Sequence, residues 1–111
     1  WVLCPESNRY ISDIKPPIQL FREMGANIAI GTDSLASARR LSMVENMRLL
    51  GDNIPIAELL SYATLNGARA MGIDATKGSI EVGKCPGLVV LSGLDMHNLQ
   101  LTAESITTRI I

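Results

Sequence analysis

The chain has 111 residues, of which 47% are hydrophobic, and its 10 basic residues nearly balance its 11 acidic ones. A hydrophobic fraction of this size indicates a packed core and excludes a disordered chain. The near-zero net charge argues against nucleic acid as a partner. No apolar run approaches the roughly 20 residues that span a bilayer, so we expect no membrane partner either.

Two features of the chain bear on its origin. Cys4 and Cys85 lie far apart and form no CxxC pair, which favours a reducing compartment, so we expect a cytoplasmic protein. The chain begins at Trp1, without Met and already inside the apolar run WVLC. We therefore expect it to be a piece of a longer protein.

The first third is predicted to alternate strands and helices. Residues 1–4 are a short apolar run that predicts a strand ending at Pro5, and residues 6–17 (ESNRYISDIKPP) are predicted to form a polar loop. Apolar residues at helical spacing predict a helix over 18–24, closed by Gly25. The apolar run NIAI and the residues after it predict a second strand over 27–32.

Three helices and two strands are predicted to follow. Ser42 and Glu45 fit a capping box for a helix that runs to about Leu50. Pro55 suits the first position of a helix over 55–63, and Thr64 suits the cap of a short helix closed by Gly72. The segments 88–91 (LVVL) and 104–111 (ESITTRII) read as strands, so the last third is expected to be small β structure.

One carboxylate stands where such a fold carries its chemistry. Alternating strands and helices imply parallel strands, whose carboxyl ends gather functional groups. Asp33 follows the second strand, and Ser7 and Asn8 follow the first. A carboxylate at this edge can bind a cation or act as a general base toward a metal-bound water. Asp33 taken alone also suits an ordinary cap or turn.

Other residues give weaker signals. Ser34 and Ser37 suit caps or loop hydrogen bonds, Cys4 suits a small buried residue more than a nucleophile, and His97 suits the surface. The motifs HxH and HExxH are absent, so these residues alone do not assemble a complete metal site. A phosphate site at the Gly31 turn is disfavoured, because the turn has one glycine and an acid where an anion needs amides.

Four segments taken together resemble a known family. CPESN, GTDSLAS, ATLNGARAMGI and KGSIEVGKCPGLVVL, in this order and spacing, are similar to the C-terminal portion of the amidohydrolase superfamily. The similarity is to the branch of cytosine deaminase, adenosylhomocysteine deaminase and chlorohydrolase, and aminodeoxyfutalosine deaminase-like proteins resemble the chain most. The chain departs from that pattern at Leu3, where many relatives have His, and at Pro86-Gly87, where relatives often have Ala-Asp.

The resemblance implies an α/β fold in two parts. Residues 1–75 would be the last two β/α units of a metal-dependent (β/α)8 (TIM) barrel. Its seventh strand would lie at Val2–Cys4 and its eighth at Asn27–Thr32. Residues 76–111 would be part of a small β-sandwich.

The resemblance also implies a reaction. The parent enzyme would hydrolyse a C–N bond, deaminating a purine-like or related ring amidine through a metal-activated water. Asp33 would bind the metal and move a proton from the attacking water to the leaving amine. Ser7 and Asn8, which follow a parallel strand at the same end as Asp33, are expected to bind the substrate, together with Ser34 and Ser37. The metal would be a divalent ion, zinc first, although iron and manganese accept the same ligands.

The remaining metal ligands would lie outside this chain, so the fragment alone is expected to be inactive. Its partners would be a small-molecule substrate and either further copies of itself, as a homo-oligomer, or the missing N-terminal part. The alternative is a non-catalytic structural or interaction module derived from such a barrel.

Overall fold

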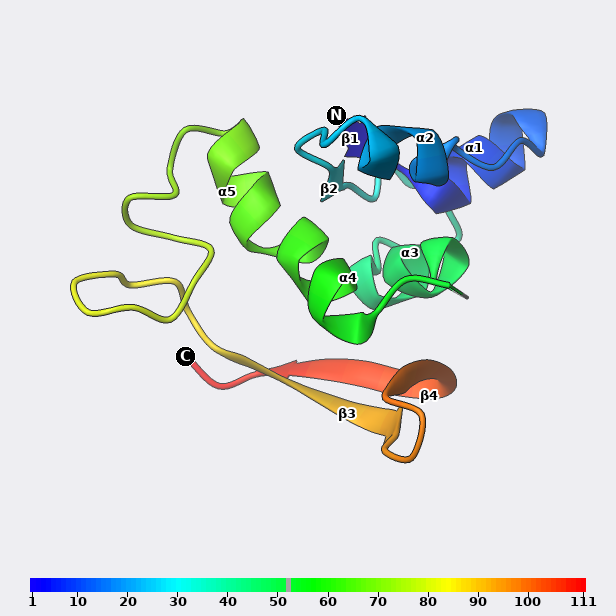
Figure 1. The fold of residues 1–111 in the computed structure, drawn as a ribbon. Helices are drawn as coiled ribbons and strands as arrows, with labels where there is room; N and C mark the ends of the chain where they lie inside the picture. Colours follow the sequence, from blue (N-terminus) through cyan, green and yellow to red (C-terminus); the bar gives the residue numbers. More distant parts are fainter. Residues whose placement is uncertain (52) are drawn as a thin grey trace.

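A computed structural model describes residues 1–51 and 53–111 (Figure 1). Within these residues the elements are, in chain order, β1 (Val2–Leu3), α1 (Pro5–Ser12), α2 (Ile18–Glu23), β2 (Ala29–Ile30), α3 (Met43–Leu50), α4 (Ile56–Ala63), α5 (Leu65–Ala70), β3 (Val89–Asp95) and β4 (Gln100–Arg109). None of the helices in this described part of the chain is long and apolar enough to cross a bilayer.

The first two strands pair in parallel, as the strand–helix alternation predicts. Val2 pairs with Ala29 and Leu3 pairs with Ile30. The Gly31 N–H extends this ladder by donating to the Leu3 carbonyl at 2.8 Å. Both strands are shorter than predicted, because the chain turns into α1 after β1 and into a loop after β2. The carboxyl ends of β1 and β2 therefore lie side by side.

The segment after β1 corrects a prediction. Residues 6–17 were expected to form a polar loop, but the chain is helical from Pro5 to Ser12. Pro5 takes the first helical position, where its missing N–H is not needed, and the Glu6 carboxylate favours the first turn of a helix. The helix ends at Asp13, whose backbone is left-handed with φ +50°. The sequence pattern did not predict this helix, because its apolar side chains are exposed and do not form a buried apolar face.

The next two helices follow their predicted positions. Helix α2 ends at Glu23 with Met24 as its C-cap, and Gly25 then takes a φ of +63°. At the start of α3 the Ser42 hydroxyl accepts the Glu45 N–H at 3.2 Å, which is half of a capping box. The other half does not form, because the Glu45 carboxylate binds Arg48 at 2.6 Å.

The junction between α4 and α5 differs from its prediction in one contact. Pro55 was predicted at the first helical position but takes the N-cap of α4, one residue earlier, whereas Thr64 precedes the first residue of α5, as predicted. The Thr64 hydroxyl donates to the Leu60 carbonyl at 2.7 Å and so does not cap α5. A glycine, Gly72 with φ +69°, follows α5, in the place predicted.

The core lies between the parallel strand pair and helices α3 and α4. It consists of apolar side chains from these elements and their flanks: Leu3, Ile28, Ile30, Met47, Ile54, Leu59 and Tyr62. A polar clamp ties α2 to α4 at its edge, because Arg22 binds both oxygens of Glu58, each at 2.8 Å. The Tyr62 hydroxyl donates to the same carboxylate.

The last part of the described chain is an antiparallel hairpin of β3 and β4, which lies below α3 and α4 in Figure 1. Both strands extend beyond the predicted segments 88–91 and 104–111 toward the turn at residues 96–99. The ladder is irregular at Gly93, where φ is +73°. Residues 76–88 form turns, bends and segments without regular secondary structure before the hairpin. The assignment of 76–111 to a β-sandwich remains a prediction.

Candidate functional site

Asp33 follows directly from the end of β2. Gly31 favours this exit, because a Cβ at this position would lie 3.1 Å from both the Cys4 sulfur and the Val2 side chain, closer than ordinary van der Waals contact. Asp33 itself has a left-handed backbone with φ +56°. Aspartate tolerates this conformation better than most residues. The exposed carboxylate therefore leaves the strand at a sharp turn, beside the carboxyl end of β1.

Two serine hydroxyls hold this carboxylate. Ser7, in the first turn of α1, donates to Asp33 Oδ2 at 2.6 Å, and Ser37 donates to the same oxygen at 2.8 Å. Both serines are almost completely buried, with 4% and 6% of their surface exposed. Each comes from the segment that follows one strand of the parallel pair. The structure thus brings together three of the site residues expected from the sequence.

The charge state of the site follows from these contacts. The hydroxyl of Ser7 first, and that of Ser37 next, lower the pKa of the Asp33 carboxyl, and the Ser34 backbone N–H adds to the effect. Asp33 is therefore ionised at neutral pH. Burial first, and then the nearby Asp33 charge, raise the pKa of the Cys4 thiol. Cys4 is consequently a neutral neighbour of the carboxylate and no activated nucleophile.

The side chains of the other two expected site residues, Asn8 and Ser34, make no hydrogen bond to the carboxylate among the described residues, and Ser34 meets it only through its backbone N–H. Asn8 follows Ser7 in α1, and its N–H donates to the Cys4 carbonyl at 2.9 Å. Among the described residues its side chain makes no hydrogen bond to Asp33. The Ser34 hydroxyl accepts the Ala36 N–H at 3.3 Å within the turn that leads to Ser37. Their predicted role in substrate binding stays a prediction.

Two residues that the sequence did not predict for the site, Asn46 and Glu6, hold the segments that carry the two serines. The fully buried Asn46 side chain accepts the Glu6 N–H at 3.0 Å and donates to the Ser42 carbonyl at 2.9 Å. Glu6 Oε1 accepts the Arg39 N–H at 3.0 Å. A signal for Asn46 existed, because it is a polar residue on the apolar side of a helix, between Val44 and Met47. Glu6 gave no such signal.

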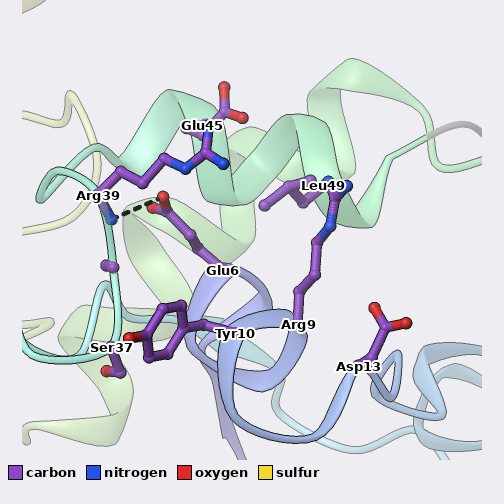
Figure 2. A pocket seen from close by; sticks show the side chains of 9 residues that line it. Glu6, Arg9, Tyr10, Asp13, Ser37, Arg39, Glu45 and Leu49 are labelled. Atoms are coloured by element: carbon purple, nitrogen blue, oxygen red, sulfur yellow. Dashed lines mark hydrogen bonds between the residues drawn. The ribbon is translucent and has the colours of Figure 1, made fainter.

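A cavity of about 350 Å³ adjoins this region. Figure 2 shows the Glu6 carboxylate bonded to the backbone of Arg39 at its edge, with Arg9 and Tyr10 also at the wall. Its lining comes from α1, the 37–39 segment and α3: Glu6, Arg9, Tyr10, Asp13, Ser37, Ala38, Arg39, Glu45 and Leu49. Ser37 therefore links the cavity to the Asp33 carboxylate.

Among the described residues, the site supplies one side chain, Asp33, that could bind a metal ion. Asp33 presents an exposed, ionised carboxylate, and the two hydroxyls that bind it both use Oδ2, so neither occupies Oδ1. Carboxylate oxygens of this kind bind zinc and other divalent ions. Across residues 1–51 and 53–111, however, no group of three or more His, Cys, Asp or Glu side chains could hold a metal. Further ligands would have to come from outside these residues.

Comparison with known proteins assigns this arrangement to a family. The family model described as "Amidohydrolase family" matches residues 1–109. A 5-methylthioadenosine/S-adenosylhomocysteine deaminase of Moorella thermoacetica is 36% identical in an alignment of 104 residues, and the match covers 85% of this chain and 24% of that protein. The chain thus spans about a quarter of the length of this relative.

Two solved structures have a similar fold. A zinc-bound adenosine deaminase from Xanthomonas campestris has a TM-score of 0.72 and 34% identity, over 93% of this chain and 26% of that one. An aminofutalosine deaminase of Helicobacter pylori, in complex with methylthio-coformycin, has a TM-score of 0.69 and 26% identity. That match covers 99% of this chain and 31% of the other. The family resemblance seen in the sequence is thus confirmed: the chain belongs to the amidohydrolase family.

Proposed function

We propose that this chain is part of a metal-dependent deaminase and supplies one carboxylate, Asp33, to its active site. The enzyme would remove an amino group by hydrolysis from the purine ring of an adenosine-type nucleoside. The observation that carries the proposal is the position of Asp33. It is an exposed, ionised carboxylate at the carboxyl end of a parallel strand, with one oxygen held by two buried hydroxyls.

The setting supports both the fold and the substrate class of this proposal. Two short parallel strands would be the last two strands of a (β/α)8 barrel, in which catalytic groups lie at the carboxyl ends of strands. The M. thermoacetica relative is named for 5-methylthioadenosine and S-adenosylhomocysteine, and the X. campestris neighbour is named an adenosine deaminase. Both names specify a purine nucleoside that carries an exocyclic amine.

Asp33 would carry a proton through the reaction. Its carboxylate would accept a proton from the attacking water, whose oxygen forms a bond to the ring carbon that bears the amine. The same carboxyl would then give the proton to the leaving nitrogen, so that the C–N bond breaks and ammonia leaves. The second proton of the water ends on the adjacent ring nitrogen, so a ring carbonyl beside a ring N–H remains. A bound divalent metal would supply a water of lowered pKa and charge stabilisation for this addition. Zinc is the first candidate, since the X. campestris neighbour has bound zinc.

The test is Asp33→Asn in the full-length protein, assayed with adenosine and 5-methylthioadenosine. The amide has the shape of the carboxylate but accepts no proton, so we expect kcat to fall by at least about 100-fold. Asp13→Asn is the matched control, because Asp13 is also exposed and left-handed, with φ +50°. We expect the control to keep wild-type kcat. Retention of more than a few per cent of kcat by Asp33→Asn would exclude the proton-carrying role.

The same experiment addresses the non-catalytic alternative. A structural module would show neither deaminase activity nor bound metal in the wild-type full-length protein. Metal content of the purified protein, measured by elemental analysis, therefore separates the two functions before any substitution is made.

A further inference from the structure

The two serines at the site share one acceptor. Ser7 and Ser37 both donate to Asp33 Oδ2, at 2.6 and 2.8 Å, and neither hydroxyl reaches Oδ1. A carboxylate oxygen offers about two lone-pair positions, so two donors fill Oδ2. Neither hydroxyl occupies Oδ1, so these two bonds leave Oδ1 to a metal ion or a proton.

Burial of the serines argues against substrate contact. With 4% and 6% of their surfaces exposed, Ser7 and Ser37 present little to a ligand in solution. Each hydroxyl has a single proton, and that proton is already donated to Asp33. Their contacts therefore suit fixing the carboxylate better than binding a nucleoside.

Each serine is held in place by another side chain. Asn46 accepts the Glu6 N–H at 3.0 Å and so ties the first turn of α1, which carries Ser7, to α3. Glu6 in turn accepts the Arg39 N–H at 3.0 Å, as Figure 2 shows, and ties the segment after Ser37 to α1. The Glu6–Arg39 bond joins the segments that follow β1 and β2, and the Glu6–Asn46 bond holds the first of them on α3. A shift of either segment would move a hydroxyl away from Asp33.

We propose that Ser7 and Ser37 are positioning residues, held by Asn46 and Glu6, which fix Asp33 so that Oδ1 faces the reaction. The inference rests on the proposed function, in which Asp33 binds the metal and carries the proton. It replaces the substrate-binding role expected for the two serines with a role in orienting the carboxylate.

The test compares Ser7→Ala and Ser37→Ala with wild type in the full-length protein. We expect Zn²⁺ affinity, measured by competition with a chromophoric chelator, and kcat each to fall by about 10- to 100-fold, as is typical when a partner of a metal ligand is lost. KM should change by less than about twofold. A raised KM with unchanged Zn²⁺ affinity would show substrate contact and would overturn the proposal.

Two further sets of variants sharpen the comparison. Glu6→Gln keeps an acceptor for the Arg39 N–H, whereas Glu6→Ala removes it, so only Glu6→Ala should weaken Zn²⁺ binding. Equal losses in the two Glu6 variants would contradict the positioning chain. Ser12→Ala is the matched serine control, because its hydroxyl donates to the Asn8 carbonyl at the far end of α1 and does not reach Asp33. It should keep wild-type values.

A structural readout separates this inference from the proposed function. In crystals of the metal-free full-length protein, Asp33 should take one orientation in wild type and more than one in the Ser7→Ala/Ser37→Ala double variant. A single, unchanged orientation in the double variant would overturn the positioning role. If the wild-type protein binds no metal and deaminates no nucleoside, the proposed function is wrong. The number of Asp33 orientations in the metal-free crystals would still test whether Ser7 and Ser37 position the carboxylate.

Discussion

Replacement of Asn46 by alanine tests the internal support of the site through stability. The Asn46 side chain is fully buried, with 0% of its surface exposed, and makes two hydrogen bonds. Alanine would leave the Glu6 N–H, in the first turn of α1, without an acceptor. It would also remove the bond to the Ser42 carbonyl, although that carbonyl keeps the Asn46 backbone N–H at 3.2 Å.

The size of the loss follows from these two bonds. A buried donor left without an acceptor costs about 1–3 kcal/mol, and a lost bond whose acceptor keeps another partner costs about 0.5–1.5 kcal/mol. We therefore expect Asn46→Ala to lower the free energy of unfolding by roughly 2–4 kcal/mol. The measurement is urea unfolding of the metal-free full-length protein, with the loss taken from the midpoint shift at a common m-value.

The control for this loss is Asn8→Ala. Asn8 is also a helical asparagine, and its side chain makes no hydrogen bond among the described residues. Its free energy of unfolding should therefore stay within about 0.5 kcal/mol of wild type. If Asn46→Ala loses no more than Asn8→Ala, the Asn46 bonds do not hold α1, and the support proposed for Ser7 is wrong.

Two other predictions concern the hairpin and the clamp between α2 and α4. At Gly93, a Cβ would lie 2.3 Å from the Glu104 carbonyl oxygen, whereas at Gly25, which is also left-handed, it meets nothing within 4 Å. In urea unfolding, Gly93→Ala should cost about 2–5 kcal/mol and Gly25→Ala only about 1–2, and equal costs would mean that the hairpin backbone relaxes freely. The Arg22 guanidinium lowers the pKa of Glu58, so the stability from this pair is present above about pH 4.5 and is lost as the pH falls through the lower folded pKa. Burial raises the pKa of Tyr62 to about 12, so its contribution is present below pH 10 and is lost between pH 10 and 12. Unfolding curves from pH 3 to 12 should show both losses, and Arg22→Gln should flatten the acid one.

The sequence predicted which site residues lie at the carboxyl ends of the parallel strands. The apolar run before Gly31 and the turn residues after it placed Asp33 at the carboxyl end of a strand. The parallel pairing of β1 and β2 then follows from the helix between them. Ser7 could be expected at the same edge for this reason, and the structure places it there with its hydroxyl on Asp33.

The hydrogen bonds that orient the site could not be predicted from local sequence patterns, because they join residues far apart in the chain. The bond between Glu6 and Asn46 joins residues 40 positions apart, and that between Glu6 and Arg39 joins residues 33 apart. Such bonds depend on how α1 packs against α3, and the sequence pattern predicted a loop where α1 forms. The reason is that Pro5 serves both as a strand terminator and as a first helical residue, and a short polar helix lacks the apolar periodicity that decides between them.

The backbone at Asp33 explains why these distant contacts matter. A left-handed backbone is less favourable for aspartate than for glycine, and contacts from the surroundings help to hold it. At Asp33 the surroundings are the Ser7 hydroxyl from one strand exit and the Ser37 hydroxyl from the other. Both exits are tied to α3 through Asn46 and Glu6. Within the described residues, the Ser7 and Ser37 hydroxyls therefore orient the carboxylate through Oδ2. Any metal ligands supplied from elsewhere would meet an acid whose Oδ1 accepts neither of these hydroxyls.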